Sequence, residues 1–352
     1  MPSVDLDAPV DPERSLALAE RLVEDQKPAD AVRLLTETNR QRRDVRVEKR
    51  LVDLRFDAFK QVDRTERLPR PECVEDLFPG ERIPEIPCEA LTVERIRSGI
   101  TNHGSLVVRG LANRDQVERL KADIDKSLAA FDARADGADR PELAGWFEPF
   151  TQDRTSNRTK KRSRGSVLAV DSPPALFDLI ETLDETRIRR LVREYFCEPP
   201  MILAKKVTLR KIARNARTGG WHQDGAFMGA GIRSLNLWLS LSYCGESAPG
   251  LDVVGRRLDE LVQSGEGAFA AWGVKPHVAE RVAKGAIERP VFEPGDALLL
   301  DHLTLHRTAV DAGMTNDRYA IETWLFAPST YDAMTTKGGQ SYEPRDQLPI
   351  LL

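Results

Sequence analysis

Residues 234–242 read Ser-Leu-Asn-Leu-Trp-Leu-Ser-Leu-Ser, and this stretch decides the fold class. Every second residue is a leucine, so the leucines project from one face of a strand. Asn236, Trp238 and Ser240 alternate with them and project from the other face. The period of two predicts a strand whose leucine face packs in a hydrophobic core and whose other face lies outside that core.

Other segments are also candidate strands, some by the same period of two and others as short apolar runs. The further candidate strands are 106–108, 205–211, 251–257, 297–300 and 318–326. Turn residues separate them, and no long helix intervenes between successive strands after residue 200. Strands in this order favour an antiparallel barrel or sandwich within a mainly β protein with helices, the α+β class.

Helical periodicity dominates the N-terminal part of the chain. We expect a helical region at 1–65 that resembles a tetratricopeptide-like hairpin, then a Pro-rich linker at 66–95. The barrel domain should fill 96–352, with an insertion at 256–290 that carries helical stretches near 258–262 and 278–284. The helices at 11–60 form either a cap packed on the main domain or a docking module for a protein partner.

Composition excludes several classes of protein. The chain has 352 residues, with 52 Lys and Arg against 56 Asp and Glu, and this balance argues against a dedicated nucleic-acid binder. Its four cysteines form no Cys-x-x-Cys pair, so we expect a reducing compartment. No apolar run is long enough for a membrane span or a signal peptide, and a cytoplasmic location is expected.

Six basic residues lie between Thr151 and Gly165, opposed by Asp153 alone. A solvated loop explains such a stretch. The functional alternative is a flap that attracts an anionic substrate, with Arg158 and Lys160 as candidate substrate contacts.

Residues 219–225 read Gly-Gly-Trp-His-Gln-Asp-Gly. On a strand, His222 and Asp224 would project from the same face about 6–7 Å apart at Cα, close enough to share a metal ion. The third ligand must come from elsewhere, and His306 is preferred over His302 because it follows a candidate strand and a short turn. Two histidines and one carboxylate form the facial triad of non-heme Fe(II) oxygenases.

Arg318 opens the last candidate strand, 12 residues after His306. An arginine that points into a barrel needs an anionic partner, and its planar fork suits a carboxylate. We expect this anion to be the distal carboxylate of 2-oxoglutarate, with the Thr308 hydroxyl as a second donor. The alternative for Arg318 is an exposed charge at the strand end.

The stretch from about 103 to 328 resembles the phytanoyl-CoA dioxygenase family of Fe(II)/2-oxoglutarate-dependent oxygenases. The matching segments, in the family's order, are 103–111, 221–225, 235–241, 294–308 and Arg318. The resemblance implies a double-stranded β-helix, which is a jelly-roll or cupin-like core. It also implies iron ligation by His222, Asp224 and His306, and a 2-oxoglutarate clamp formed by Arg318 and Thr308.

The resemblance further implies that Gln223 and Trp238 line the co-substrate pocket, with Lys205 or Lys206 on an early strand. Asn236 and Ser240 are candidate substrate contacts. The implied cofactors are Fe(II), 2-oxoglutarate and O2, and the implied reaction hydroxylates an unactivated C–H bond with release of succinate and CO2.

The substrate implied in this way is a small organic molecule or a carrier- or CoA-linked one. Asp224 argues against a halogenase, in which a small residue replaces the carboxylate. Two alternatives remain open: a cupin-like metal-binding protein that does not use 2-oxoglutarate, and a non-catalytic scaffold with a helical docking region.

Overall fold

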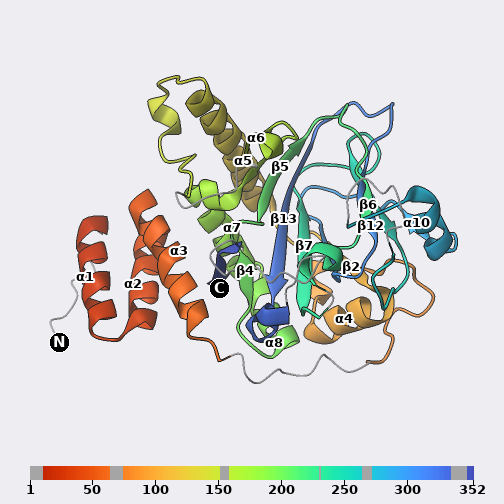
Figure 1. The fold of residues 1–352 in the computed structure, drawn as a ribbon, viewed down its shortest axis with the longest axis horizontal. Coiled ribbons are helices and arrows are strands. Elements are labelled where there is room, and N and C mark those ends of the chain that lie inside the picture. Colours follow the sequence, from red (N-terminus) through yellow and green to blue (C-terminus); the bar gives the residue numbers. More distant parts are fainter. Residues whose placement is uncertain (1–10, 64–73, 151–157, 230, 264–271, 334–346) are drawn as a thin grey trace.

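A body built of two β-sheets carries three helices at one end (Figure 1). This computed structural model describes residues 11–63, 74–150, 158–229, 231–263, 272–333 and 347–352. The fold is mixed α+β with large sheets, as the alternating segments predicted.

The larger sheet has nine strands in the order β1-β2-β11-β7-β13-β4-β14, with β5 paired to β13 and β3 paired to β5. All neighbours are antiparallel except β1 and β2. The strands span Glu85–Pro87 (β1), Ser105–Arg109 (β2), Ser166–Leu168 (β3), Met201–Leu203 (β4), Thr208–Ile212 (β5), Ser234–Ser240 (β7), Ala297–Leu300 (β11), Arg318–Phe326 (β13) and Pro349–Leu351 (β14).

The smaller sheet has five antiparallel strands in the order β10-β8-β12-β6-β9. Its strands span Trp221–His222 (β6), Gly250–Val254 (β8), Gly273–Val274 (β9), Ile287–Glu288 (β10) and His306–Ala309 (β12). Two of them, β9 and β10, lie in the predicted insertion and add an edge strand on either side of the sheet. The insertion therefore supplies both edge strands of the smaller sheet.

The strand predicted at 234–242 is confirmed, and its two faces have different surroundings. Its leucines are buried in the main hydrophobic core, together with residues of the helices α5 (Arg114–Ala135) and α7 (Pro173–Glu185). On the other face, Asn236 and Trp238 line a cavity whose remaining walls come partly from the smaller sheet. Alternation along β7 thus separates the apolar core from a polar interior.

Helices α5 and α7 pack in the core of the larger sheet, whereas α10 (Pro276–Ala283) lies beside the smaller sheet (Figure 1). None of the described helices combines the length and apolar character needed to cross a bilayer. The helices beyond the N-terminal three span Val93–Ser98 (α4), Arg114–Ala135 (α5), Arg158–Arg162 (α6), Pro173–Glu185 (α7), Ile188–Phe196 (α8), Gly225–Met228 (α9) and Pro276–Ala283 (α10).

Two parts of the sequence-based organisation need correction. No helix forms at 258–262, although α10 matches the stretch predicted at 278–284. The linker predicted at 66–95 contains strand β1, which pairs in parallel with β2, and residues 64–73 lie outside the described residues. Backbone hydrogen bonding to a neighbouring strand thus orders a segment whose prolines suggested an extended connection.

The three N-terminal helices, Pro12–Glu24 (α1), Pro28–Gln41 (α2) and Val45–Lys60 (α3), lie side by side (Figure 1). Asp11 and Asp44 cap α1 and α3 with their carboxylates. The helices share one hydrophobic core with the body, where the ring of Phe59 lies 5.0 Å from that of Tyr331. Arg55 of α3 donates a 2.8 Å hydrogen bond to the carbonyl of Leu351 in β14.

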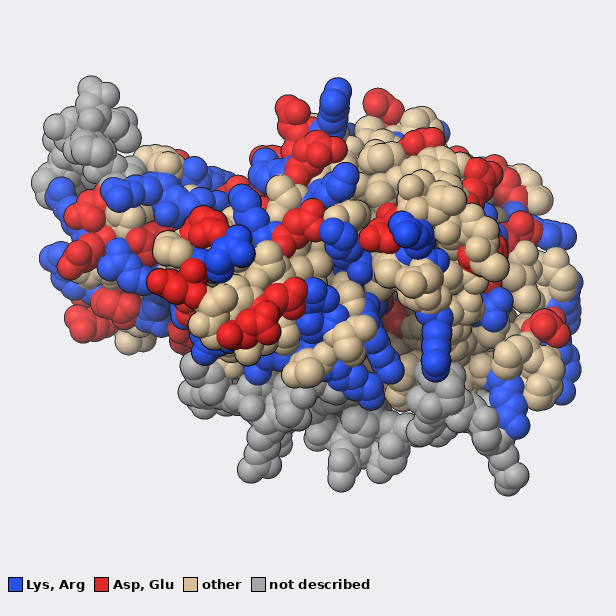
Figure 2. Space-filling model, turned by 90° about the horizontal axis from the view of Figure 1, so that it is seen from above, with Lys and Arg blue, Asp and Glu red and all other residues tan. Residues whose placement is uncertain are grey.

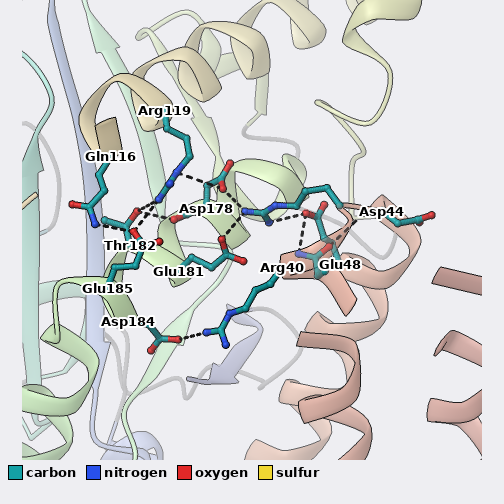
Figure 3. A network of polar contacts seen from close by, with 12 residues as sticks. Arg40, Asp44, Glu48, Gln116, Arg119, Asp178, Glu181, Thr182, Asp184 and Glu185 are labelled. Atoms are coloured by element: carbon teal, nitrogen blue, oxygen red, sulfur yellow. Dashed lines mark hydrogen bonds and ion pairs between the residues drawn. The ribbon is translucent and has the colours of Figure 1, made fainter. Parts of the chain in front are cut away.

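A polar network joins the N-terminal helices to α7 (Figure 3). The guanidinium of Arg43 pairs with Asp178 and Glu181 of α7 and, at 3.0 Å, with Glu48 of α3. Burial dominates at Glu48 and raises the pKa of its carboxyl group to about 7. The helical region is thus docked by charged as well as apolar contacts.

This network predicts an unusual dependence of stability on pH. Burial and the neighbouring Asp178 raise the pKa of Asp123, on α5, to about 8. Since its pKa in the unfolded chain is near 3.8, the folded state binds the extra proton between these values, and stability falls as pH rises through that window. We expect Asp123→Asn to remove part of this fall, on the order of 2 kcal/mol between pH 5 and pH 8.5.

Thermal unfolding followed by circular dichroism across that pH range measures the effect. Asp115→Asn, at an exposed site on the same helix, is the matched control and should keep the wild-type slope. Identical slopes in all three proteins would contradict the assignment to Asp123.

Candidate metal centre

The fold brings two histidines from distant segments together as cross-strand partners. His222 on β6 pairs with His306 on β12, and their ring centroids lie 4.4 Å apart. Oδ1 of Asp224 lies 3.9 Å from Nε2 of His222. One ligand atom from each of the three residues lies within 4.8 Å of the others, so a single metal ion could contact all three.

Asp224 reaches this position by a route that differs from the predicted one. Strand β6 ends at His222, and Asp224 has helical dihedral angles at the start of α9. The backbone turns there beside His302, whose carbonyl accepts a 2.8 Å hydrogen bond from Gly225. A Cβ at Gly225 would lie 2.8 Å from the His302 ring, so the tight approach requires glycine.

Backbone carbonyls orient both imidazoles. Nδ1 of His222 lies 2.9 Å from the Gly220 carbonyl, and Nδ1 of His306 lies 3.0 Å from the Thr304 carbonyl. Each Nδ1 therefore carries the proton, and each Nε2 has its lone pair available. Burial and the neighbouring His306 lower the pKa of His222 to about 4, which keeps it in the neutral form that binds metals.

The larger sheet fixes one oxygen of the Asp224 carboxylate. Oδ2 accepts hydrogen bonds of 3.0 Å from the Asn236 amide and 2.8 Å from the Trp324 indole. These donors are cross-strand partners on β7 and β13. Oδ1 is buried and has no hydrogen-bond partner among the described residues, which is costly unless a cation contacts it. The three side chains therefore fit a divalent metal.

The other histidines have different surroundings. Nδ1 of His302, the competing ligand, lies 2.8 Å from Oδ1 of Asp301. Nε2 of His103 lies 2.8 Å from Oδ1 of Asp76, and His277 is exposed on α10. The structure brings none of these three into the group around Asp224.

A cavity between the two sheets contains the histidines and a buried arginine. Only 1% of Arg318 is exposed, and burial lowers its pKa to about 10. One Nη donates at 2.8 Å to the Gly250 carbonyl, whereas Nε has no partner in the described chain. The cavity is lined by Arg210, His222, Asn236, Trp238, Leu251, Leu300, His306, Thr308, Arg318 and Glu322.

The guanidinium of Arg318 has no carboxylate within ion-pair distance among the described residues. It lies 5.4 Å from the ring centre of Trp238, and the hydroxyl-bearing Thr308 lines the same cavity. A buried cation that keeps an unused donor is suited to bind an anion that enters the cavity. The predicted clamp residues thus lie beside the candidate ligands.

Two residues predicted for the co-substrate pocket point elsewhere. The Gln223 amide donates at 2.6 Å to the Leu303 carbonyl and accepts at 2.7 Å from the Val262 amide, so it fastens a loop of the insertion. Lys205 extends over the ring of Phe150, 5.7 Å from its centre. Neither residue lines the cavity.

The four candidate substrate contacts are scattered. Asn236 lines the cavity but orients Asp224, whereas the Ser240 hydroxyl donates to the Ser242 carbonyl. In the predicted basic flap, Arg158 pairs with Asp171 at 2.7 Å, and Lys160 is exposed on α6. Residues 151–157 of that stretch lie outside the described residues.

Several residues at the site have no counterpart in the sequence-based prediction. Glu322 and Trp324 follow Arg318 at a period of two on β13, and this spacing could have identified them. Phe227 and Trp272 lie 6.4 and 5.5 Å from the His222 ring and form an aromatic wall. Only the folding of the insertion brings Trp272 there.

No protein-family model matches this chain, and no curated protein matches it either. Among solved structures, the chain is similar to SnoK, a non-heme alpha ketoglutarate dependent carbocyclase from nogalamycin biosynthesis. The two share 14% identity at a TM-score of 0.51, over 76% of this chain and 99% of SnoK.

Two further similarities are weaker. EctD from S. alaskensis, solved with 2-oxoglutarate and 5-hydroxyectoine, shows 17% identity and a TM-score of 0.46 over 74% of this chain and 83% of EctD. AviO1 from Streptomyces viridochromogenes Tue57 shows 19% identity and a TM-score of 0.43 over 67% of this chain and 94% of AviO1. At these identities the likeness to SnoK concerns the fold alone.

The contacts of Asp224 generate a prediction about metal affinity. Trp324→Phe removes an indole donor from Oδ2, which frees the carboxylate to rotate, so we expect the affinity for Co(II) to fall by about 10- to 100-fold. Isothermal titration measures it. Trp146→Phe, where the indole ring packs against Lys126 instead, is the control and should bind Co(II) as the wild type does. Equal affinity in both variants would mean that Trp324 does not position the ligand.

Proposed function

We propose that this chain is an Fe(II)/2-oxoglutarate-dependent dioxygenase that hydroxylates an unactivated C–H bond of an organic substrate. The observation that carries the proposal is the convergence of two imidazoles and a carboxylate, with both imidazoles and a buried guanidinium lining one cavity. His222, Asp224 and His306 would hold the iron. When bound, iron supplies the oxidation of substrate by O2, coupled to conversion of 2-oxoglutarate into succinate and CO2.

Arg318 binds and orients the co-substrate in this proposal. Its free Nε donor and its position in a partly apolar cavity suit the distal carboxylate of 2-oxoglutarate. The Thr308 hydroxyl offers a further donor to the same group. Leu251 and Leu300 line the cavity and exclude water, which strengthens the ion pair.

The residues around His222 define the other side of the site. Phe227 and Trp272 present aromatic surface there, so they would contact an apolar part of the substrate. A rigid wall of this kind orients one carbon of the substrate relative to the metal ligands.

The metal ligands supply the first test of the proposal. We expect His222→Ala and Asp224→Ala to abolish 2-oxoglutarate-dependent succinate formation, because each removes one of three donors to the ion. His277→Ala, at an exposed histidine on α10 outside the ligand group, should retain activity. Succinate is measured by chromatography, and circular dichroism checks folding. Wild-type turnover in His222→Ala would refute the mechanism.

The clamp supplies a second test. Arg318→Lys keeps a positive charge but loses the guanidinium fork, so we expect the 2-oxoglutarate concentration at half-maximal rate to rise at least about tenfold. Arg214→Lys, an exposed control, should leave it unchanged. An anaerobic Fe(II) sample should also develop a visible absorption band on addition of 2-oxoglutarate. Absence of that band in the wild type would favour a metal-binding protein that does not use 2-oxoglutarate.

A further inference from the structure

Basic residues gather where β5 borders the cavity, on the side where α6 lies beside β5. Arg210 on β5 lines the cavity with His222 and His306, and its Nε donates at 2.9 Å to Oε2 of Glu322. Burial would raise the pKa of Glu322, but the charge of Arg210 and its hydrogen bond lower it below its usual value, so the carboxylate is charged. This ion pair neutralises the charge of Glu322.

Two lysines add positive charge next to that ion pair. The ammonium of Lys206 lies 5.7 Å from the ring centre of Phe227, on the aromatic wall beside His222. Lys161 projects from α6 and has no ion-pair partner among the described residues. Burial, the charge of Arg210 and the charge of Lys206 lower the pKa of Lys161 to about 8. Arg210 and Lys206 face the carboxylates of Glu322 and Asp224, so Lys161 adds a third cation to two carboxylates at this edge.

The surface agrees with this distribution of charge. Seen from above, the molecule has a hollow with Lys and Arg side chains on both sides (Figure 2). In Figure 1, α6 lies beside the upper end of β5, on the side from which that view is taken. An excess of positive charge at the opening of a cavity attracts anions and raises their local concentration.

We propose that the substrate carries an anionic group, a carboxylate or a phosphate, which binds Lys161 and Arg210 while the apolar part of the substrate lies against Phe227 and Trp272. The inference rests on the proposed function only in placing this group next to the reacting centre. It deepens that function by assigning the substrate to the organic anions. The anion subsite shares its cavity with the Arg318 clamp, which would hold 2-oxoglutarate, and differs from it by the contribution of Lys161 on α6.

The test titrates three small aromatic probes into the full-length chain by calorimetry. Phenyl phosphate and benzoate are the anionic probes, and benzyl alcohol is the neutral one. Each titration is run on the metal-free protein and on the protein with Zn(II) and saturating 2-oxoglutarate. We expect both anionic probes to bind more tightly than benzyl alcohol in both samples, and the tighter one identifies the preferred group.

The variants locate the subsite. Lys161→Gln removes one cation and should weaken phenyl phosphate binding about tenfold, because one charge–charge contact is lost in a partly buried site. Lys160→Gln, its exposed neighbour on the same helix, is the matched control and should change binding less than about twofold. The double variant Arg210→Gln/Glu322→Gln removes both members of the ion pair together and should weaken binding as well.

Two results would overturn the proposal. One is wild-type phenyl phosphate affinity in Lys161→Gln. The other is loss of phenyl phosphate binding on addition of 2-oxoglutarate or in Arg318→Lys, since the anion would then occupy the clamp. Failure of the proposed function would give a different result. The protein would then not bind 2-oxoglutarate, whereas the titrations of the metal-free protein would still test the anion subsite.

Discussion

The buried carboxylate of Asp224 is the constraint on which the site depends. The larger sheet holds one of its oxygens through Asn236 and Trp324, and the other oxygen faces the two histidines of the smaller sheet. A buried charge that loses such contacts is strongly destabilising. The spacing and register of the two sheets are therefore tied to a single side chain, and the candidate metal site lies where the sheets meet.

Periodicity predicted the central strands because their two faces differ so clearly. Alternating leucines identified β7, and an apolar run and a period of two identified β11 and β13. The same reasoning failed at Asp224. Strand β6 ends at His222, so the alternation of side chains along a strand does not extend to Asp224. A turn that requires glycine brings the carboxylate to His222 instead. The sequence motif was thus interpreted with the wrong backbone geometry, although its side chains do come together.

Other parts of the site depend on contacts that a local pattern does not encode. Gln223 stands between two candidate ligands in the sequence, yet its amide binds backbone groups of the insertion. Trp272 lies in the predicted insertion, and Lys161 lies in the basic stretch predicted as a solvated loop or an anion-attracting flap, but no local pattern singled out either residue. Glu322 differs from these, because it shares a face of β13 with Arg318 and could have been found from the period alone.

The position of β6 has a consequence for engineering. This two-residue strand pairs with β12 on one side and with β9 of the insertion on the other, so Gly273 lies opposite His222. The same insertion supplies Trp272 to the aromatic wall. A chimera that grafts a foreign insertion here would also remove backbone support from an imidazole of the candidate metal centre. In the proposed enzyme, a change of substrate range through the insertion would therefore also alter the metal ligands.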